Sequence, residues 1–180
     1  YTVATTKEIA DKYNIKKISD LAKYNNQFII SPTMEFVNRD DGLNELSKLY
    51  GLKFKSVKAM DGSLRYSALK NGDCQFIDAF STEGLLKAFD LQVLEDDREF
   101  FPPYNAVPVI RMDTLEKYPE LKEAIMKLDN IINEEEMAKL NYLVETEGQD
   151  ESKVAKDFLI EKGLMIAFSK SSETFNVSFK

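Results

Sequence analysis

The sequence predicts an α/β protein with a largely parallel, buried sheet in its first part and helices alone near its end. Up to about residue 95, short apolar runs typical of strands alternate with amphipathic runs that have the period of helices. This alternation is typical of folds in which helices cover a parallel sheet. Beyond residue 111 the apolar residues follow the helical period only, until a short tail.

The expected elements of the first part are short and closely spaced. Thr5 and Glu8 have the spacing of a capping box, so the first helix should begin there. Asp61 is the expected cap of a later helix, and Gly51 should end the helix at residues 41–50. The predicted strands lie at residues 1–4, 27–31, 54–59, 76–80 and 91–94. The predicted helices lie at residues 5–13, 20–24, 41–50, 61–71 and 83–89.

Paired prolines at positions 102 and 103 are the strongest break in the pattern, because they continue neither a helix nor a central strand. We predict a lobe boundary there. A strand at residues 106–111 should follow, and then three helices that begin near Pro119, at Asn133 and at Asp150, the last of them ending at Gly163. Residues 164–168 and 175–179 read as strand-like.

These boundaries divide the chain into a central α/β ligand-binding lobe (residues 1–103), the C-terminal part of another lobe (104–163) and a tail of unknown role (164–180). Three helices and one strand cannot complete a sheet. We therefore expect the sheet of the second lobe to lie in sequence outside this chain. Because the chain opens on a strand-like run, we also expect it to be a piece of a longer protein.

Composition excludes several classes of function. The net charge of −7, with Lys and Arg interspersed among the acids, disfavours nucleic acid as a partner. Without histidine and with one cysteine, the chain cannot build a zinc site or a histidine-based triad, so we expect no enzyme and no cofactor. Cys74 opens an apolar run and reads as a buried, inert strand residue. No apolar run is long enough to cross a membrane.

Candidate binding residues lie where predicted strands end, which is where open α/β folds bind ligands. Tyr104 follows the paired prolines and suits a cation–π contact, or it is a packed aromatic residue. Arg65 lies in the first turn of a helix, where it could hold a carboxylate or belong to a surface cap. Glu35 could be a counter-ion for a ligand cation or a loop acid. Phe80 and Ser81 could face a cleft, or be a core residue and an N-cap.

Taken together and in order, these segments resemble the osmoprotectant-binding subunits of ABC importers, over residues 1–165. The matching stretches are 61–72 (DGSLRYSALKNG), 78–84 (DAFSTEG), 94–97 (LEDD), 100–104 (FFPPY), 106–109 (AVPV), 118–121 (YPEL), 136–137 (EM), 140–142 (LNY), 147–148 (EG) and 154–159 (VAKDFL). That family binds glycine betaine, choline, carnitine and related solutes. After residues 41–42 (DG) the family often has YPGL, whereas this chain has LNEL, so the loop near the cleft could differ.

The resemblance implies a type II periplasmic-binding-protein-like fold, with one α/β lobe and the helical C-terminal part of a second, incomplete lobe. It also implies a ligand caught between the lobes in an aromatic cage. Tyr1 and Tyr104 match cage tyrosines of the family by position, and Phe80 matches an aromatic residue that lines the pocket. Glu35 and Arg65 fall in segments at the edge of the pocket. The family normally begins with a further lobe segment that bears another cage aromatic, and this chain does not include it.

The partners implied are a quaternary-ammonium or betaine solute and an ABC permease subunit, with no nucleic acid. The expected location is extracytoplasmic, as a lipoprotein or fused to the permease. Two alternatives stay open: the same importer class for a ring-bearing betaine such as ergothioneine, and the effector-sensing domain of a transcription regulator. The second alternative would require a helix-turn-helix segment, which the sequence lacks.

Overall fold

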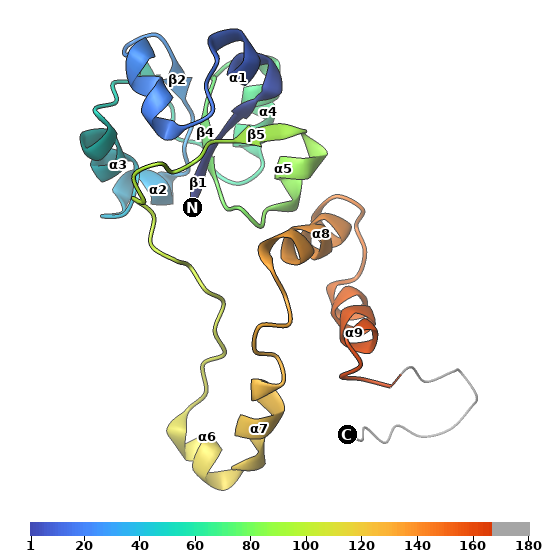
Figure 1. Ribbon diagram of the computed structural model, residues 1–180. Helices are drawn as coiled ribbons and strands as arrows, with labels where there is room; N and C mark the ends of the chain where they lie inside the picture. The colour runs from blue at the N-terminus through green and yellow to red at the C-terminus, as the bar shows by residue number, and fades with distance from the viewer. Residues whose placement is uncertain (167–180) are drawn as a thin grey trace. The chain divides into compact units, whose positions relative to one another are not determined.

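A computed structural model describes residues 1–166 of the chain (Figure 1). The described residues divide into two compact units, Tyr1–Tyr104 and a second one that begins at Asn105. The strands of the first unit are β1 (Thr2–Thr6), β2 (Ile29–Ile30), β3 (Ser56–Val57), β4 (Ile77–Ala79) and β5 (Leu91–Val93). Its helices are α1 (Lys7–Tyr13), the 3₁₀ helix η1 (Ile18–Tyr24), α2 (Met34–Asn38), α3 (Leu43–Tyr50), α4 (Leu64–Asn71) and α5 (Gly84–Ala88).

The strands of the first unit form a three-stranded antiparallel sheet and a two-stranded parallel one, which corrects the expectation of a single, largely parallel sheet. β1 lies between β4 and β5 and runs antiparallel to both. β2 and β3 pair in parallel, and a parallel bridge between Ile30 and Phe76 joins them to the segment that leads into β4. The sequence could not show the direction of β1, because its partners lie more than 70 residues further along the chain and strand alternation is the same in either direction.

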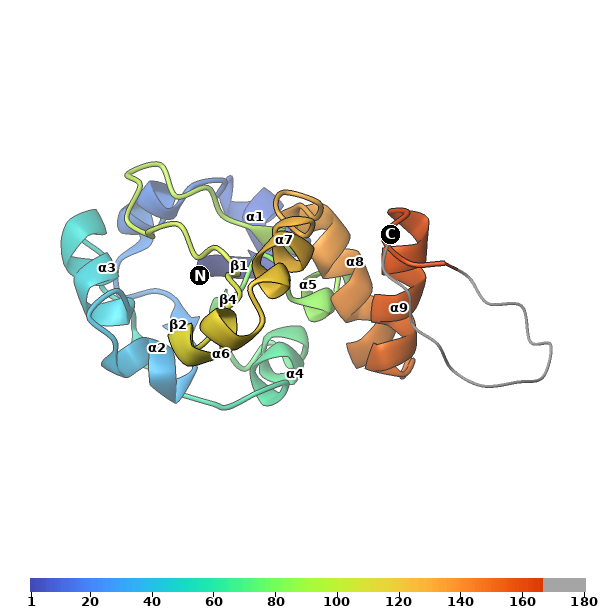
Figure 2. The same cartoon turned by 90° about the horizontal axis from the view of Figure 1, so that it is seen from below.

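Two apolar clusters form the core, one on each face of β1. Val3 belongs to the cluster that includes Leu43, Leu46 and Tyr50 of α3, whereas the next residue, Ala4, belongs to the cluster beneath α4 and α5. Neighbouring strand residues point to opposite faces, so one strand serves both clusters. Accordingly, α2 and α3 lie on one side of β1 and α5 lies on the other (Figures 1 and 2). The predicted α/β fold is confirmed.

Several local predictions for the first unit are confirmed and others are wrong. Gly51 ends α3 with a positive φ of 68°, as expected. The cap of α1 is Thr6, whose hydroxyl accepts the Ile9 N–H, rather than Thr5. No side chain caps α4, so Asp61 does not have its predicted role. Cys74 is fully buried, which raises the pKa of its thiol, although it precedes β4 instead of lying within it.

The second unit is helical over its described part, with α6 (Met112–Lys117), α7 (Glu120–Met126), α8 (Glu134–Glu145) and α9 (Glu151–Glu161). Asn133 and Glu136 form the capping box of α8, and Asp150 caps α9, as predicted. Helix α6 was not predicted. The predicted strand at residues 106–111 is wrong, since this segment has no regular secondary structure and no strand partner, and Val109 is 90% exposed. A strand needs a neighbour, and the described part of this unit supplies none.

Part of the predicted strand-like tail can be checked. Leu164, Met165 and Ile166 are not in a strand. The rest of the run at 164–168, and the whole of 175–179, lies outside the described residues. Within residues 1–166, no helix combines the length and the apolar composition that a membrane-spanning helix requires.

Candidate functional site

Five aromatic side chains gather at the beginning of β1, and we call them the aromatic cluster: Tyr1, Phe36, Phe80, Phe101 and Tyr104. The pairing of Thr2 with Ala79 brings Tyr1 beside Phe80, and their ring centroids are 4.3 Å apart. The Tyr1 ring also lies 5.0 Å from Phe36 and meets Tyr104 edge-on at 5.6 Å. The cluster is built entirely from residues of the first unit.

The cluster has a buried base and an exposed rim. Phe36 is a residue of α2, and its fully buried ring belongs to the same apolar cluster as Val3. Phe80 and Tyr104 are 38% and 43% exposed, although each contacts Tyr1. Aromatic rings that are held by neighbours and still present a free surface are suited to binding an apolar or cationic group.

Three charged residues from α2 and the loop after it border the cluster. The Arg39 guanidinium donates two hydrogen bonds to Asp41, at 2.6 and 2.8 Å, and a third to Glu35 at 3.3 Å. Its central carbon lies 5.4 Å from the centroid of the Tyr1 ring. The hydroxyl of Tyr104 donates to Asp41 at 2.7 Å. This border therefore carries one positive and two negative charges beside the rings.

The pKa values of these groups lie far from neutral pH. Burial, followed by the hydrogen bond with Glu35, raises the pKa of Tyr1 to about 12. Burial and the bond to Asp41 likewise raise the pKa of Tyr104. The guanidinium of Arg39, followed by the Tyr104 hydroxyl, holds the pKa of Asp41 well below its usual range. Both phenols therefore stay neutral at physiological pH, while the arginine and the aspartate stay charged.

The structure brings four of the six predicted site residues together: Tyr1, Phe80 and Tyr104 in the cluster, and Glu35 at its border. Ser81 is exposed in the turn after Phe80, and α5 begins only after Glu83, so it is not the cap of that helix.

Arg65 is the exception. It is 4% exposed and its guanidinium bonds to the Asp78 and Gly62 carbonyl oxygens and to both carboxylate oxygens of Glu83. These contacts leave it committed to the protein interior instead of the cluster.

Sequence reasoning missed Arg39, Asp41 and the buried ring of Phe36 as members of the site. These residues were missed because helix α2 was not predicted. Because Glu35 and Arg39 are four residues apart, a helix there places them on one face, where they form an ion pair. Without a predicted helix, that spacing had no structural meaning.

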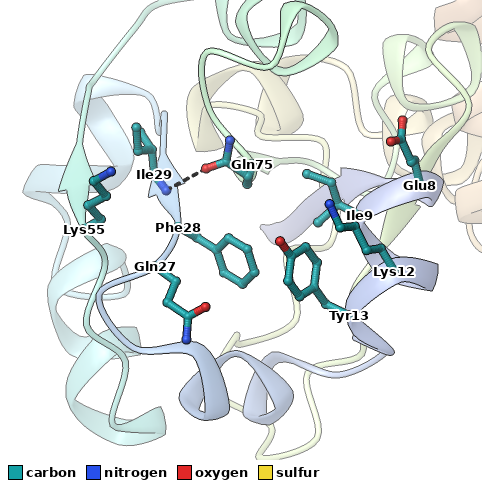
Figure 3. Close-up of a pocket in the computed structure, with 9 residues that line it drawn as sticks. All are labelled: Glu8, Ile9, Lys12, Tyr13, Gln27, Phe28, Ile29, Lys55 and Gln75. Atoms are coloured by element: carbon teal, nitrogen blue, oxygen red, sulfur yellow. Dashed lines mark hydrogen bonds between the residues drawn. The ribbon is translucent and has the colours of Figure 1, made fainter.

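A separate cavity of about 420 Å³ lies at the other end of β1, where α1 begins (Figure 3). Figure 3 shows the rings of Tyr13 and Phe28 next to each other in its lining, where they meet edge-on with centroids 4.9 Å apart. The remaining lining residues are Glu8, Ile9, Lys12, Gln27, Ile29, Lys55 and Gln75. None of the predicted site residues lines this cavity. Among the described residues, no group of three or more Cys, Asp or Glu side chains is arranged to hold a metal ion.

Solved structures define the class of protein to which this fold belongs. A crystal structure of a glycine betaine/carnitine/choline ABC transporter protein superposes with a TM-score of 0.77 at 38% identity, covering 91% of this chain and 60% of that one. The structure of apo YehZ from Escherichia coli gives a TM-score of 0.65 at 28% identity, covering 90% and 61%. The class is therefore that of periplasmic-binding-protein-like components of transporters.

The family follows from a match over residues 1–161. The chain belongs to the family described as the substrate binding domain of the ABC-type glycine betaine transport system. The predicted family is thereby confirmed.

Curated relatives agree with this family. The ergothioneine transport permease/ergothioneine binding protein EgtU of Helicobacter pylori is 42% identical over 91% of this chain and 30% of its own length. The carnitine transport binding protein OpuCC of Listeria monocytogenes is 37% identical over 88% and 52%. A glycine-betaine-binding protein of Pseudomonas aeruginosa is 36% identical over 92% and 57%. The chain thus spans about half, or less, of the length of these relatives.

Proposed function

We propose that the chain is part of the solute-binding component of an ABC importer and that it captures a quaternary-ammonium compatible solute such as glycine betaine, choline or carnitine. The observation that carries the proposal is the aromatic cluster, in which Phe80 and Tyr104 each contact the Tyr1 ring and keep more than a third of their surface exposed. Family membership and the names of the relatives support the same class of solute. On this proposal the protein is a binding protein and not an enzyme.

The recognition we propose is a cation–π contact. A trimethylammonium group spreads its charge over several methyl groups and is weakly hydrated, so aromatic faces can replace its water. Each ring contributes on the order of 0.5–2 kcal/mol once water is excluded. The position of Arg39 supports this, because the protein's own diffuse cation already lies against the Tyr1 ring.

The charged border supplies a partner for the other end of the solute. Arg39 is the cation beside the rings, so we assign to it the carboxylate of a betaine or carnitine, in place of the buried Arg65. A guanidinium donates charge-assisted hydrogen bonds to a carboxylate, and the solute would share this one with Asp41 and Glu35. The excess of negative charge from Glu35 and Asp41 favours the ammonium end.

The lobes are also part of the proposal. Residues 1–103 would form the ligand-binding lobe and residues 104–163 the C-terminal part of the other lobe, with the rest of that lobe contributed by sequence outside this chain. The lengths of the relatives support this arrangement. Closure of the lobes around the solute would complete the cage and present the closed form to the permease.

Substrate-binding proteins of ABC importers work outside the cytoplasm, and we place this one there. The proposal includes two ways of holding the protein at the membrane, as a lipoprotein or by fusion to the permease. The relative whose name joins a permease to a binding protein supports fusion as one of them. The same relative supports ergothioneine, a ring-bearing betaine, as a second candidate solute, for which Glu35 would offer a polar contact beside Tyr1.

Calorimetric titration of the complete gene product with glycine betaine, choline, carnitine and ergothioneine tests the proposal. We expect one of them to bind with a Kd in the micromolar range and Tyr104→Ala to weaken that binding about tenfold or more, since a ring face is lost. If none of the four binds, the quaternary-ammonium assignment fails. Binding that is unchanged in Tyr104→Ala would remove this residue from the cage.

A further inference from the structure

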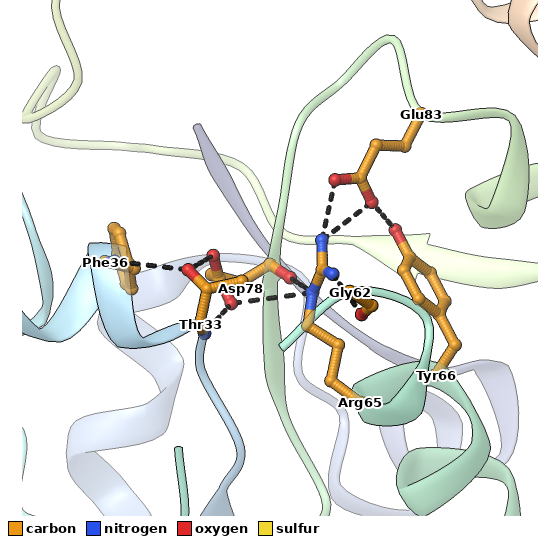
Figure 4. A network of polar contacts seen from close by, with 7 residues as sticks. All are labelled: Thr33, Phe36, Gly62, Arg65, Tyr66, Asp78 and Glu83. Atoms are coloured by element: carbon orange, nitrogen blue, oxygen red, sulfur yellow. Dashed lines mark hydrogen bonds and ion pairs between the residues drawn. The ribbon is translucent and has the colours of Figure 1, made fainter. Parts of the chain in front are cut away.

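A polar network around a buried aspartate adjoins Phe36 of the aromatic cluster (Figure 4). Its centre is Asp78 in β4, two residues before Phe80, and this side chain is fully buried. A buried carboxylate is costly unless charged and hydrogen-bonded partners surround it. Burial raises the pKa of Asp78, while its bonds with Thr33 and the charge of Arg65 act against that rise. The groups that are hydrogen-bonded to Asp78 are therefore the parts of the fold that this residue holds in place.

One arm of the network fixes the beginning of α2. The Thr33 N–H donates to one carboxylate oxygen of Asp78 at 2.7 Å, and the Thr33 hydroxyl donates to the other at 2.8 Å. The same hydroxyl oxygen accepts the Phe36 N–H at 3.1 Å and so caps the helix. Because α2 carries Glu35 and Phe36 and Arg39 directly follows it, the Asp78–Thr33 contact sets where these side chains meet the Tyr1 ring.

The second arm fixes the turn that presents Phe80. Arg65 Nε donates to the Asp78 carbonyl oxygen at 2.9 Å, and its Nη2 donates to both carboxylate oxygens of Glu83, at 2.6 and 2.9 Å. The Tyr66 hydroxyl also donates to Glu83. Arg65 thus bridges the residues on either side of the turn 79–82, as Figure 4 shows. Its buried guanidinium clamps both ends of that turn.

The backbone of Asp78 completes the arrangement, because Asp78 pairs with Val3 of β1, two residues from Tyr1. Three parts of the aromatic cluster therefore depend on one residue. Resting on the function proposed above, we infer that Thr33, Asp78, Arg65 and Glu83 are positioning residues: they preorganise the aromatic cluster for the solute without touching it. Preorganisation improves affinity by lowering the ordering cost of binding.

The two arms make separable predictions in the protein without solute. Thr33→Val removes the hydroxyl that links Asp78 to α2, so the nuclear Overhauser effect between the Tyr1 and Phe36 rings should weaken, while that between Tyr1 and Phe80 persists. Glu83→Gln removes the negative charge that Arg65 contacts. The effect between the Tyr1 and Phe80 rings should then weaken, while that between Tyr1 and Phe36 persists. This ring-to-ring readout requires no ligand, so it tests the inference even if the proposed function is wrong.

Thr5→Val is the matched control. Thr5 is fully buried, whereas Thr33 is half-buried, and the Thr5 hydroxyl donates to the Gln75 carbonyl oxygen at 2.7 Å at the other end of β1. In the complete protein, at a temperature where circular dichroism shows every variant folded, we expect Thr33→Val to weaken glycine betaine binding about fivefold or more. We expect Thr5→Val to stay within about twofold, and Thr33→Ser, which restores the hydroxyl, to recover the affinity.

The outcomes are distinguishable. Wild-type protein that binds none of the solutes overturns the proposed function, and the ring contacts then decide the inference alone. Wild-type binding with equal losses in Thr33→Val and Thr5→Val, or with ring contacts unchanged in both arms, overturns the inference. If Glu83→Gln does not fold, Tyr66→Phe takes its place in the comparison, because it removes the Tyr66–Glu83 hydrogen bond of the same arm.

Discussion

At the scale of single residues, the site depends on rings that are held in place but not covered. Phe80 and Tyr104 would be ordinary core residues if they were buried, and ordinary surface residues if they were isolated. Instead each contacts Tyr1 and keeps more than a third of its surface exposed. Their exposed surface adds little to folding, so substitutions there should affect binding more than stability.

The first prediction separates ring face from apolar volume. Phe80→Leu keeps an apolar side chain but removes the π face, so affinity for choline should fall about tenfold while the free energy of unfolding changes by less than about 1 kcal/mol. Calorimetric titration and urea unfolding give the two quantities. The matched control is Tyr118→Leu, because Tyr118 is 44% exposed and lies outside the cluster. Equal effects in the two variants would contradict the cation–π account.

The second prediction concerns the charged border. Arg39→Gln should weaken binding of glycine betaine about tenfold and leave choline within about twofold, because only the betaine offers a carboxylate to the guanidinium. The ratio of the two dissociation constants is the measurement. A ratio that does not change would mean that Arg39 serves Asp41 and Glu35 alone. Arg39→Gln would then remove only the ion pairs of Arg39 with Glu35 and Asp41.

The residues alone pointed to Phe80, at the end of a predicted strand, and to Tyr104, at the lobe boundary, whereas Tyr1 was predicted only through the family resemblance. Arg65 was a candidate because an arginine in a first helical turn could hold a carboxylate, and the family resemblance put it at the edge of the pocket. Burial of that arginine depends on Glu83 and Asp78, which lie 13 or more residues away. Long-range pairing of this kind leaves no local signal.

At the scale of elements, what the sequence could predict depended on length and local caps. Helices α8 and α9 were predicted because Asn133 and Asp150 are recognisable caps of long amphipathic runs. Helix α2 has only five residues, too few to show a helical period, and it was missed. Residues 106–111 have the composition of a strand, but a strand exists only with a neighbour.

The third prediction tests the cap of η1. Three hydrogen bonds to Asp20 define it: one carboxylate oxygen accepts the N–H groups of Lys16 and Lys17, both at 3.1 Å, and the other accepts from Lys23 at 2.7 Å. The contact with Lys23, followed by that with Lys16, lowers the pKa of Asp20 from 3.8 to about 2. A lowered pKa in the folded state adds stability that is complete above about pH 4 and is lost as the pH falls towards 2.

Asp20→Asn should therefore cost about 1 kcal/mol of unfolding free energy at pH 7, and much less at about pH 2.5. Urea unfolding of both proteins at the two pH values gives the comparison. A cost that is the same at both would show that the charge of Asp20 contributes nothing and that only its hydrogen-bond geometry matters.

At the scale of the whole molecule, the two units differ in how much apolar surface they bury. The first unit has two apolar clusters, whereas in the described helices of the second unit only Val154 is buried. Met112 and Met126 are 69% and 58% exposed. Helices without a buried face gain little stability from packing. This agrees with the proposal that the second unit completes its core with sequence outside this chain.

The fourth prediction follows from this difference. In hydrogen exchange, amides of α6 and α7 should exchange much faster than those of β1 and α4 when the chain is studied alone, because few contacts oppose their opening. In the complete gene product, exchange in α6 and α7 should slow down while β1 and α4 change little. Strong protection of α6 and α7 in the isolated chain would contradict the proposed division into lobes.

The central claim is that the aromatic cluster binds a diffuse positive charge, and a neutral isostere tests it most directly. 3,3-Dimethyl-1-butanol has the shape of choline with carbon in place of the charged nitrogen. Titrated into the complete protein, choline should bind at least about tenfold more tightly than the alcohol, and Phe80→Leu should remove most of that difference. Equal affinity for the two compounds would mean that the rings recognise shape and apolar surface only, and it would contradict the account.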